Sequence, residues 1–252
     1  MPKILITGCS SGFGLETAKH FLSQGWEVIA TMRNPKEDIL APSERLSILA
    51  LDVSNEQSIQ EAVAAAGPLD ALVNNAGVGM LGVLEGTAMP TIRSLFETNT
   101  FGAMAVIQAA LPQFRRQRSG VIVNVSSSVT LRPLPLLAAY SASKAALNAF
   151  SESLSLELEG FGIKVRLVLP GRSPETAFGK NAQAETRKQG ASIPEPYSDL
   201  AQNVFERMQG ASGPVTLASD VTAAIWRAVT DPSCPARLPA GADSEEWARS
   251  SR

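Results

Sequence analysis

The sequence predicts a doubly wound α/β fold, in which one parallel sheet of about seven strands carries helices on both faces. Short aliphatic runs alternate with amphipathic segments along the first 170 residues, and this alternation is typical of sheets built from βαβ units. The apolar runs are continuous, as expected for strands that are buried on both faces. Right-handed crossovers then place helices on both sides of the sheet.

Seven segments are predicted to be strands because each is a short apolar run that ends near a glycine, a proline or a polar residue. They are Lys3–Thr7, Glu27–Thr31, Leu46–Leu51, Ala71–Asn74, Val121–Val125, Lys164–Leu169 and the short run Ala236–Pro239. The alternation of these runs with helical segments is what favours a parallel arrangement over an antiparallel one.

Helices are predicted from apolar residues at helical spacing and from residues that cap helix ends. They cover Phe13–Gln24, 54–66, Met89–Gln117, Tyr140–Phe161, 199–209 and 219–230. Ser54 and Gln57 form a capping-box pattern, and Ser219-Asp220 is expected to cap the last helix. Pro112, which has no amide hydrogen, predicts a kink or a break in the long segment.

Composition excludes several classes of protein. The 252 residues are 44% hydrophobic and 18% charged, an ordinary globular balance. Two cysteines, Cys9 and Cys234, cannot build a disulfide framework, and one histidine, His20, excludes a histidine metal cluster or a Ser-His-Asp triad. The 22 basic and 24 acidic residues leave no footprint for nucleic acid. No apolar run is long enough to span a bilayer, and no signal peptide precedes the first strand, so we expect a soluble, cytoplasmic protein.

A glycine-rich turn lies between the first predicted strand and the first predicted helix, where residues 7–14 read Thr-Gly-Cys-Ser-Ser-Gly-Phe-Gly. Gly8 permits the tight turn, Gly12 lets the backbone approach a pyrophosphate, and Gly14 lets the helix pack closely on the strand. The helix N-terminus offers N–H groups and a partial positive charge to an anion. An unliganded Gly/Ser turn is the alternative. The predicted phosphate contacts are Gly8, Ser10, Ser11, Gly12, Phe13 and Gly14.

The T-G-x-x-x-G-x-G spacing of this turn resembles that of the short-chain dehydrogenase/reductase family, and five further motifs follow in the family's order. Asn74-Asn75-Ala76-Gly77 follows the fourth strand, Asn99 lies in the long helix, and Ser126-Ser127 follows the fifth strand. Tyr140-Ser141-Ala142-Ser143-Lys144 supplies the family's Y-x-x-x-K, and Pro170-Gly171 ends the sixth strand. The resemblance covers the chain up to residue 171 and implies a Rossmann-type fold.

The resemblance implies an NAD(P)-dependent oxidoreductase that interconverts an alcohol with a ketone or aldehyde. Tyr140 would be the acid/base, and Lys144 would lower its pKa. Ser127, which lies 13 residues before Tyr140 as in the family, would position the substrate oxygen, and Asn99 would support a proton relay. Spacing of four residues puts Tyr140 and Lys144 on one helix face, and a neighbouring ammonium lowers the pKa of a phenol by about 1–3 units.

The end of the second strand bears on the choice of cofactor. Folds that prefer NAD carry an acid there to bind the ribose 2′-hydroxyl, but this sequence reads Ala30-Thr31-Met32-Arg33-Asn34. Arg33 can pair with a 2′-phosphate through two N–H groups, so we expect NADP rather than NAD. A solvated loop residue is the alternative interpretation of Arg33. Asp52-Val53 resembles the family's adenine contact.

The resemblance assigns the remaining cofactor contacts to Asn75, Ala76, Gly77, Tyr140, Lys144, Pro170, Gly171 and Thr176. The family usually has a threonine four residues past the glycine of the Pro-Gly pair, where it contacts the nicotinamide amide. Here Thr176 lies five residues past that glycine. Either Thr176 shifts into place or Ser173 substitutes for it. Arg172, which is also unusual there, could instead bind an anionic group of the substrate or cofactor.

Residues 131–137 are mainly apolar and are expected to line a substrate pocket, although these leucines could instead belong to the core. Residues 29–35 look similar to the hydroxysteroid- and retinol-dehydrogenase-like branch, and a hydrophobic ketone, aldehyde or alcohol is therefore the expected substrate. The resemblance also implies a homodimer or homotetramer.

We expect residues 1–252 to form one domain, because no linker, repeat or low-complexity tract divides them. Residues 172–213 are polar and rich in Gly, Pro, Ser and Gln, and we interpret them as a substrate-lid insertion. A variable surface excursion is the alternative.

Two other functions stay open. A catalytically silent nucleotide-binding sensor or scaffold would keep the glycine-rich turn without the Tyr/Lys set, whereas this chain has both. An epimerase or dehydratase of the family's extended branch would reuse Tyr140 and Lys144, but those chains are longer and use another glycine spacing.

Overall fold

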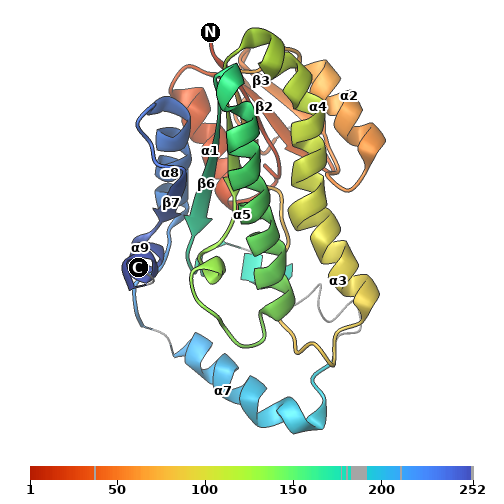
Figure 1. The fold of residues 1–252 in the computed structure, drawn as a ribbon, viewed down its shortest axis with the longest axis vertical. Coiled ribbons are helices and arrows are strands. Elements are labelled where there is room, and N and C mark those ends of the chain that lie inside the picture. The colour runs from red at the N-terminus through yellow and green to blue at the C-terminus, as the bar shows by residue number, and fades with distance from the viewer. Residues whose placement is uncertain (37, 177, 180, 183–191, 211, 251–252) are drawn as a thin grey trace.

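The computed structural model confirms the doubly wound fold and describes all residues except 37, 177, 180, 183–191, 211 and 251–252 (Figure 1). The strands are β1 (Lys3–Ile6), β2 (Glu27–Met32), β3 (Leu46–Ala50), β4 (Ala71–Asn74), β5 (Gly120–Val125), β6 (Ile163–Pro170) and β7 (Arg237–Ala240). The described residues form one parallel sheet in the order β3-β2-β1-β4-β5-β6-β7. The direction of winding reverses between β1 and β4, and such folds bind ligands where this reversal occurs.

The helices are α1 (Gly12–Ser23), α2 (Glu56–Ala66), α3 (Met89–Phe96), α4 (Gly102–Gln117), α5 (Ala138–Leu158), α7 (Ser198–Gln209), α8 (Ala218–Thr230) and α9 (Ala242–Ser250). The predicted strands agree with these bounds to within about one residue at each end. The C-terminal helix α9 was not predicted, and it follows directly from the last strand.

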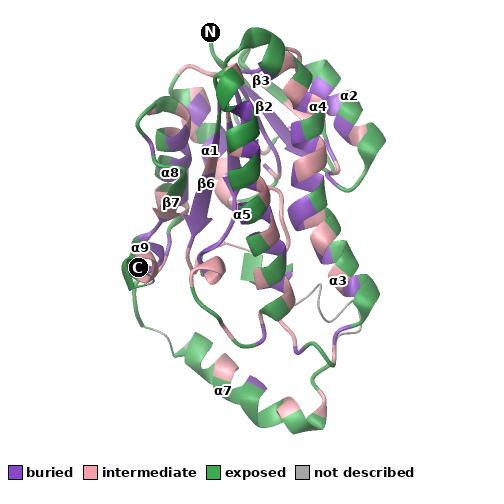
Figure 2. Ribbon diagram, in the orientation of Figure 1, coloured by how far each residue is buried: buried purple, intermediate pink, exposed green. Residues whose placement is uncertain are grey.

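Alternate side chains of the central strands supply two separate cores, one on each face of the sheet. Ile4 and Ile6 of β1 join the cluster that contains residues of α1 and α8. Leu5, between them, joins the cluster that contains residues of α2, α4 and α5. Successive side chains of a strand point to opposite faces, so burial on both sides explains the continuous apolar runs. Figure 2 shows the buried strands between the partly exposed helices.

Two predicted helix caps are wrong in detail. Asn55, rather than Ser54, is the N-cap of α2, and its side chain accepts a hydrogen bond from the backbone N–H of Ser58 at 2.9 Å. Ser54 instead donates through its N–H and its hydroxyl to the carboxylate of Asp52. This local bond competes with the capping role, as short polar side chains commonly do.

The cap of α8 is also shifted. The helix begins at Ala218, so Ser219 lies inside it, and the carboxylate of Asp220 accepts the N–H of Leu217 at 2.9 Å. An acidic residue in the first turn therefore satisfies a backbone donor that precedes the helix.

The expected break at Pro112 is not found, because α4 continues through this residue to Gln117. Pro112 lies on the exposed side of the helix, where water can bond the carbonyl that the proline leaves unpaired. The irregularity lies earlier in the segment, in a π-helical turn over Glu97–Phe101 that separates α3 from α4. Such turns often occur at functional sites, and this one carries Asn99.

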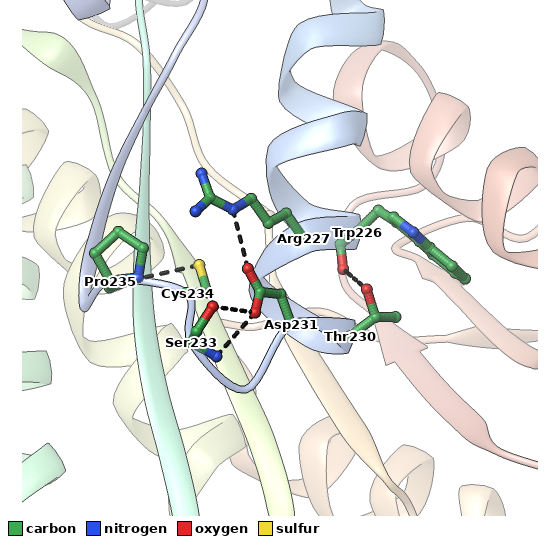
Figure 3. A network of polar contacts seen from close by, with 7 residues as sticks. All are labelled: Trp226, Arg227, Thr230, Asp231, Ser233, Cys234 and Pro235. Carbon is green, nitrogen blue, oxygen red and sulfur yellow. Dashed lines mark hydrogen bonds and ion pairs between the residues drawn. The ribbon is translucent and has the colours of Figure 1, made fainter.

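The turn between α8 and β7 is held by its own side chains (Figure 3). The carboxylate of Asp231 accepts hydrogen bonds from the N–H and the hydroxyl of Ser233, and it accepts one from Arg227 at the end of α8. The bonds from Ser233, followed by that from Arg227, hold the pKa of Asp231 below its usual value. This compact turn returns the chain to the edge of the sheet, from which α9 follows.

Among the described residues, no helix is both long and apolar enough to cross a bilayer.

Candidate active site

The glycine-rich turn has the geometry that its spacing predicts. Gly8 and Gly12 adopt φ values of 74° and 58°, which favour glycine. A Cβ atom on Gly14 would collide with the carbonyl oxygen of Gly8, so only glycine allows α1 to begin this close to β1. The N-terminus of α1 has no side-chain cap within the described structure and no acidic residue in its first turn. Its backbone N–H groups and its dipole are thus available to an anion.

Thr7 and Asn75 hold the glycine-rich turn against the end of β4. The amide of Asn75 donates to the carbonyl oxygens of Thr7 and Gly8, at 2.9 and 3.2 Å. The hydroxyl of Thr7 accepts the N–H groups of Asn75 and Ala76, both at 3.0 Å. The side chain of Asn75, which was expected to contact the cofactor, is therefore used to fix the turn. Thr7, whose role was not predicted, is the first residue of the glycine-rich turn motif.

Helix α5 brings Tyr140 and Lys144 beside the end of β5, as their spacing predicts. Both side chains are buried, with exposed fractions of 6% and 4%. The ammonium of Lys144 donates to the carbonyl oxygen of Val125 at 3.0 Å. Ser127, two residues further on, is also buried, and it lies close enough to Tyr140 to act on the pKa of its hydroxyl. The structure thus places three of the four predicted catalytic residues in one buried region, and the fourth, Asn99, lies near Lys144.

The pKa values of this pair differ from expectation. Burial raises the pKa of Tyr140 to about 12, against the opposing effect of the Ser127 hydrogen bond. Burial lowers the pKa of Lys144 to about 8. The expected lowering of the Tyr140 pKa is not found, because removal of the phenolate from water dominates the net shift, and the Lys144 ammonium is bonded to a backbone carbonyl.

Asn99, in the π-helical turn, lies on the other side of Lys144. Its amide oxygen accepts the N–H of Val78 at 2.8 Å, and its amide nitrogen donates to the Val78 carbonyl at 2.9 Å and to Ser143 at 3.1 Å. A Cβ atom on Gly77 would lie 3.2 Å from the Asn99 oxygen and 3.4 Å from the Lys144 nitrogen. The absence of a side chain at Gly77 therefore leaves room for these two groups to approach each other.

Two buried polar residues near the site, Asn124 and Ser151, were missed by the sequence analysis. The amide of Asn74 at the end of β4 donates to Asn124 in β5 at 2.9 Å, and Asn124 donates to the hydroxyl of Ser151 in α5 at 2.8 Å. These bonds tie the two central strands to the helix that carries Tyr140. An asparagine within the otherwise apolar run of β5 is the signal that could have revealed this chain of bonds.

Thr176, rather than Ser173, faces the glycine-rich turn. The Cβ and Cγ2 atoms of Thr176 lie 3.7 Å from the position that a Cβ atom on Gly12 would occupy. Its hydroxyl donates to the carbonyl of Ser173 at 3.0 Å. The hydroxyl of Ser173 is buried without a hydrogen-bond partner among the described residues. A turn over residues 173–176 thus brings Thr176 beside Gly12.

Arg33 and Asp52 follow β2 and β3 at the same edge of the sheet as the glycine-rich turn. Arg33 is exposed. The hydrogen bond from Ser54 is the main cause that holds the pKa of Asp52 below its usual value, and the charge of Arg33 acts in the same direction. Val53 is largely buried, and Gly102 of α4 packs closely against it.

Cys9 and His20 both pack against other residues away from the Ser127, Tyr140 and Lys144 set. Cys9 is buried and donates to the carbonyl of Ile6, and burial raises the pKa of its thiol to about 12. The ring of His20 packs edge-on against that of Trp226, with 5.1 Å between ring centres. No cluster of metal-binding side chains occurs in the part of the chain that the structure describes.

The fold and this site together define a class of protein: a doubly wound α/β protein with a glycine-rich turn after its first strand and a buried set of Ser127, Tyr140 and Lys144. A sequence model of the short chain dehydrogenase family matches residues 2–187. The chain belongs to this family.

Two relatives of known name illustrate the similarity. Retinol dehydrogenase 8 from Bos taurus is 41% identical over 180 residues, which are 67% of this chain and 58% of that protein. The 3-ketodihydrosphingosine reductase of Bacteroides thetaiotaomicron is 42% identical over 172 residues, or 67% of this chain and 62% of that protein. The chain therefore matches less than two thirds of the length of either relative.

Solved structures agree over nearly the whole chain. A short-chain dehydrogenase from Streptomyces avermitilis superposes with a TM-score of 0.85 and 32% identity, over 99% of this chain and 92% of that one. A Burkholderia cenocepacia dehydrogenase in complex with NADP superposes with a TM-score of 0.76 and 25% identity, over 98% of this chain and 91% of that one. A Burkholderia phymatum relative in complex with NAD superposes with a TM-score of 0.80 and 25% identity, over 94% of this chain and 88% of that one. Proteins of this fold thus bind either nucleotide.

Proposed function

We propose that this protein is an NADP(H)-dependent oxidoreductase that reduces a hydrophobic ketone or aldehyde to its alcohol, or catalyses the reverse reaction. The observation that carries the proposal is that Ser127, Tyr140 and Lys144 are all buried, with the Lys144 nitrogen next to Gly77, two residues after the Asn75 that holds the glycine-rich turn. Burial of three polar side chains costs free energy, and such groups with shifted pKa values cluster at functional sites.

The residues that line the glycine-rich turn fit a dinucleotide. The pyrophosphate would lie against the uncapped N-terminus of α1, which offers N–H groups and no competing carboxylate. Arg33 would pair with the 2′-phosphate of the adenosine ribose, and Asp52-Val53 would lie near the adenine. Thr176 would contact the nicotinamide amide after the turn at Pro170-Gly171. The remaining proposed contacts are Gly8, Ser10, Ser11, Gly12, Phe13, Gly14, Asn75, Ala76, Gly77, Tyr140 and Lys144. The bound nicotinamide would supply or accept the hydride.

Tyr140 would act as the proton donor when a carbonyl is reduced. Because its pKa is raised to about 12, its hydroxyl is protonated at neutral pH and can give its proton to the developing alkoxide. Ser127 would donate a hydrogen bond to the same oxygen. At neutral pH the ammonium of Lys144 would stabilise the phenolate that remains, because its pKa of about 8 keeps it mainly charged. Asn99 would keep the loop at Val78 in place beside that ammonium.

The surroundings of Tyr140 support an apolar substrate. Met80 and Leu95 pack in the same buried cluster as Tyr140, and the ring of Phe178 lies 6.0 Å from the Tyr140 ring, measured between centres. Pockets for small molecules are mostly apolar with a few polar anchors. The two relatives described above are named for retinol and 3-ketodihydrosphingosine, both of which are rich in hydrocarbon.

The described parts of the segment 172–213, which include α7, are proposed to cover this apolar region, within one domain of residues 1–252; residues 177, 180, 183–191 and 211 of the expected lid lie outside the described residues. In Figure 1, α7 lies beyond the carboxyl ends of the strands. Its residues Ala201 and Phe205 pack in a cluster with Val83 and Leu136, and Leu136 lies in the segment that precedes Tyr140. The homo-oligomer and the cytoplasmic location stay predictions.

The test is a side-by-side titration of NADPH and NADH into wild type and Arg33→Ala. Wild type is expected to bind NADPH at least tenfold more tightly, a difference of about 1.4 kcal/mol, and the variant is expected to lose that preference. Lys36→Ala, another cationic residue beyond β2, is the matched control. Equal binding of the two nucleotides by wild type would refute the NADP preference. Nucleotide binding without turnover of any apolar carbonyl would favour the silent sensor or scaffold.

A further inference from the structure

Asp243 is a buried acidic residue that the proposed reaction does not use. It lies in the first turn of α9, and 7% of its surface is exposed. One carboxylate oxygen accepts the backbone N–H of Arg172 at 2.6 Å, and the other lies 2.7 Å from the hydroxyl of Thr216. A buried carboxylate is stable only where hydrogen-bond donors surround it. The donors around Asp243 therefore indicate which part of the backbone it positions.

Thr216 completes a bonded arrangement around Gly171 and Arg172. Thr216 is entirely buried. Its hydroxyl accepts the N–H of Gly171 at 2.9 Å, and its own N–H donates to the carbonyl of Arg172 at 2.8 Å. The N–H groups of Gly171 and Arg172 and the carbonyl of Arg172 are therefore bonded to residues from the last fifth of the chain.

Glycine is required on both sides of this arrangement. A Cβ atom on Gly171 would collide with the carboxylate of Asp243. A Cβ atom on Gly241, where φ is 95°, would collide with Thr216. The backbone after β6 and the start of α9 thus approach each other more closely than any side chain would allow, which fixes their relative position.

Helix α9 fastens two further parts of the site. The hydroxyl of Ser244 donates to the carbonyl of Leu169 in β6 at 2.6 Å. The ring of Trp247 lies 4.9 Å from the guanidinium of Arg132, in the segment between Ser127 and Tyr140. One short helix therefore contacts both the turn that leads to Thr176 and the segment that leads to Tyr140.

We propose that Asp243 is a positioning residue for the nicotinamide end of the cofactor site. Its carboxylate, with Thr216, fixes the backbone of Gly171 and Arg172, and this backbone sets where Thr176 meets the glycine-rich turn. The inference rests on the proposed function, because it assumes that a nicotinamide nucleotide binds there. It assigns part of the cofactor site to α9, which lies outside every motif in the sequence.

The test compares two probes that differ in the nicotinamide half. Asp243→Asn is expected to weaken NADPH binding by about tenfold, which corresponds to about 1.4 kcal/mol. Binding of 2′,5′-ADP, which lacks the nicotinamide half, is expected to change by less than about twofold, because Asp243 does not contact the turn that would hold its phosphates. Glu245→Gln, which removes an exposed acid from the same helical turn, is the matched control and is expected to leave both affinities unchanged.

A second pair of variants separates positioning from folding. Thr216→Val is expected to reproduce the selective loss, whereas Thr216→Ser, which keeps the hydroxyl, is expected to retain NADPH binding. The melting temperature of each variant is recorded in parallel. Equal weakening of both probes by Asp243→Asn, or no weakening of either, would overturn the inference. Wild type that binds no nicotinamide nucleotide would instead refute the proposed function, and a wild type that prefers NADH is tested with NADH and ADP.

Discussion

The glycine-rich turn and the turn after β6 both border the candidate site, yet different kinds of residue hold them. Thr7 and Asn75 fix the first turn, and they come from motifs at the ends of two adjacent strands, β1 and β4. Asp243 and Thr216 fix the second turn, and they belong to no motif. The sequence pattern therefore predicts a function for the first turn, whereas only the fold reveals which residues hold the second.

A large stability effect is expected at Lys144, which belongs to the Tyr140–Lys144 motif. Its pKa falls from 10.5 to about 8 on burial, which corresponds to a folding cost of about 3 kcal/mol at neutral pH. Lys144→Met removes that cost but leaves the Val125 carbonyl unpaired, at about 1 kcal/mol. We expect the variant to be more stable than wild type by about 2 kcal/mol at pH 7 and to lose turnover.

The sign of this effect depends on pH. Below pH 8 the native state bears the full cost of the buried ammonium, and this cost fades as the pH rises from about 8 to 10.5, where the unfolded chain also loses its proton. Urea unfolding of both proteins across this range is the measurement. A wild type that is the more stable protein at pH 7 would contradict a buried, costly ammonium.

A stability effect of comparable size is expected when the glycine-rich turn is strained. Gly14→Ala places a Cβ atom against the Gly8 carbonyl, and overpacking of this kind costs about 1–3 kcal/mol. Because the N-terminus of α1 must shift, the affinities for NADPH and 2′,5′-ADP should fall together. Calorimetric titration checks this, with Gly160→Ala, where a Cβ atom meets nothing within 4 Å, as control. Unchanged binding of both probes would mean that no phosphate rests on this turn.

Asn75→Ala sharpens the contrast with Asp243. It leaves the Thr7 and Gly8 carbonyls without their side-chain donor, at about 1–3 kcal/mol. Both probes should bind more weakly to about the same degree, in contrast to the selective loss proposed for Asp243→Asn. Weaker binding of NADPH without weaker binding of 2′,5′-ADP would contradict the assignment of the phosphates to the glycine-rich turn and of the nicotinamide to the turn after β6.

The smallest effects are expected within the turn after β6. Ser173→Ala removes a buried hydroxyl that has no partner among the described residues, so stability and NADPH binding should both change little. Thr176→Ala should weaken NADPH binding several-fold. The reverse order of effects would assign the nicotinamide contact to Ser173.

The sequence predicted the regular part of the molecule well. Strand runs buried on both faces and glycines with one steric purpose each leave little choice of structure, so β1 to β7 and the glycine-rich turn were found near their true bounds. Tyr140 and Lys144 were placed on one face because helical spacing requires it.

What the sequence missed depends on tertiary contacts. The choice of Asn55 over Ser54 as a cap follows from the bond that Ser54 makes to Asp52. The direction of the Tyr140 pKa shift follows from burial, which no local pattern encodes. Helix α9 has mostly polar residues and few apolar ones, so its periodicity is weak, and the role of Asp243 depends on a partner 71 residues away.

The most direct test of the account is the reduction of an apolar ketone by NADPH with wild type and Tyr140→Phe, together with the affinity of each for NADPH. The account predicts that the variant still binds NADPH, with at most a several-fold loss of affinity because one proposed cofactor contact is removed, but turns over about 10²–10⁴-fold more slowly, since it lacks the proton donor. Turnover by Tyr140→Phe at the wild-type rate would contradict the role of Tyr140 and, with it, the proposed chemistry of the site.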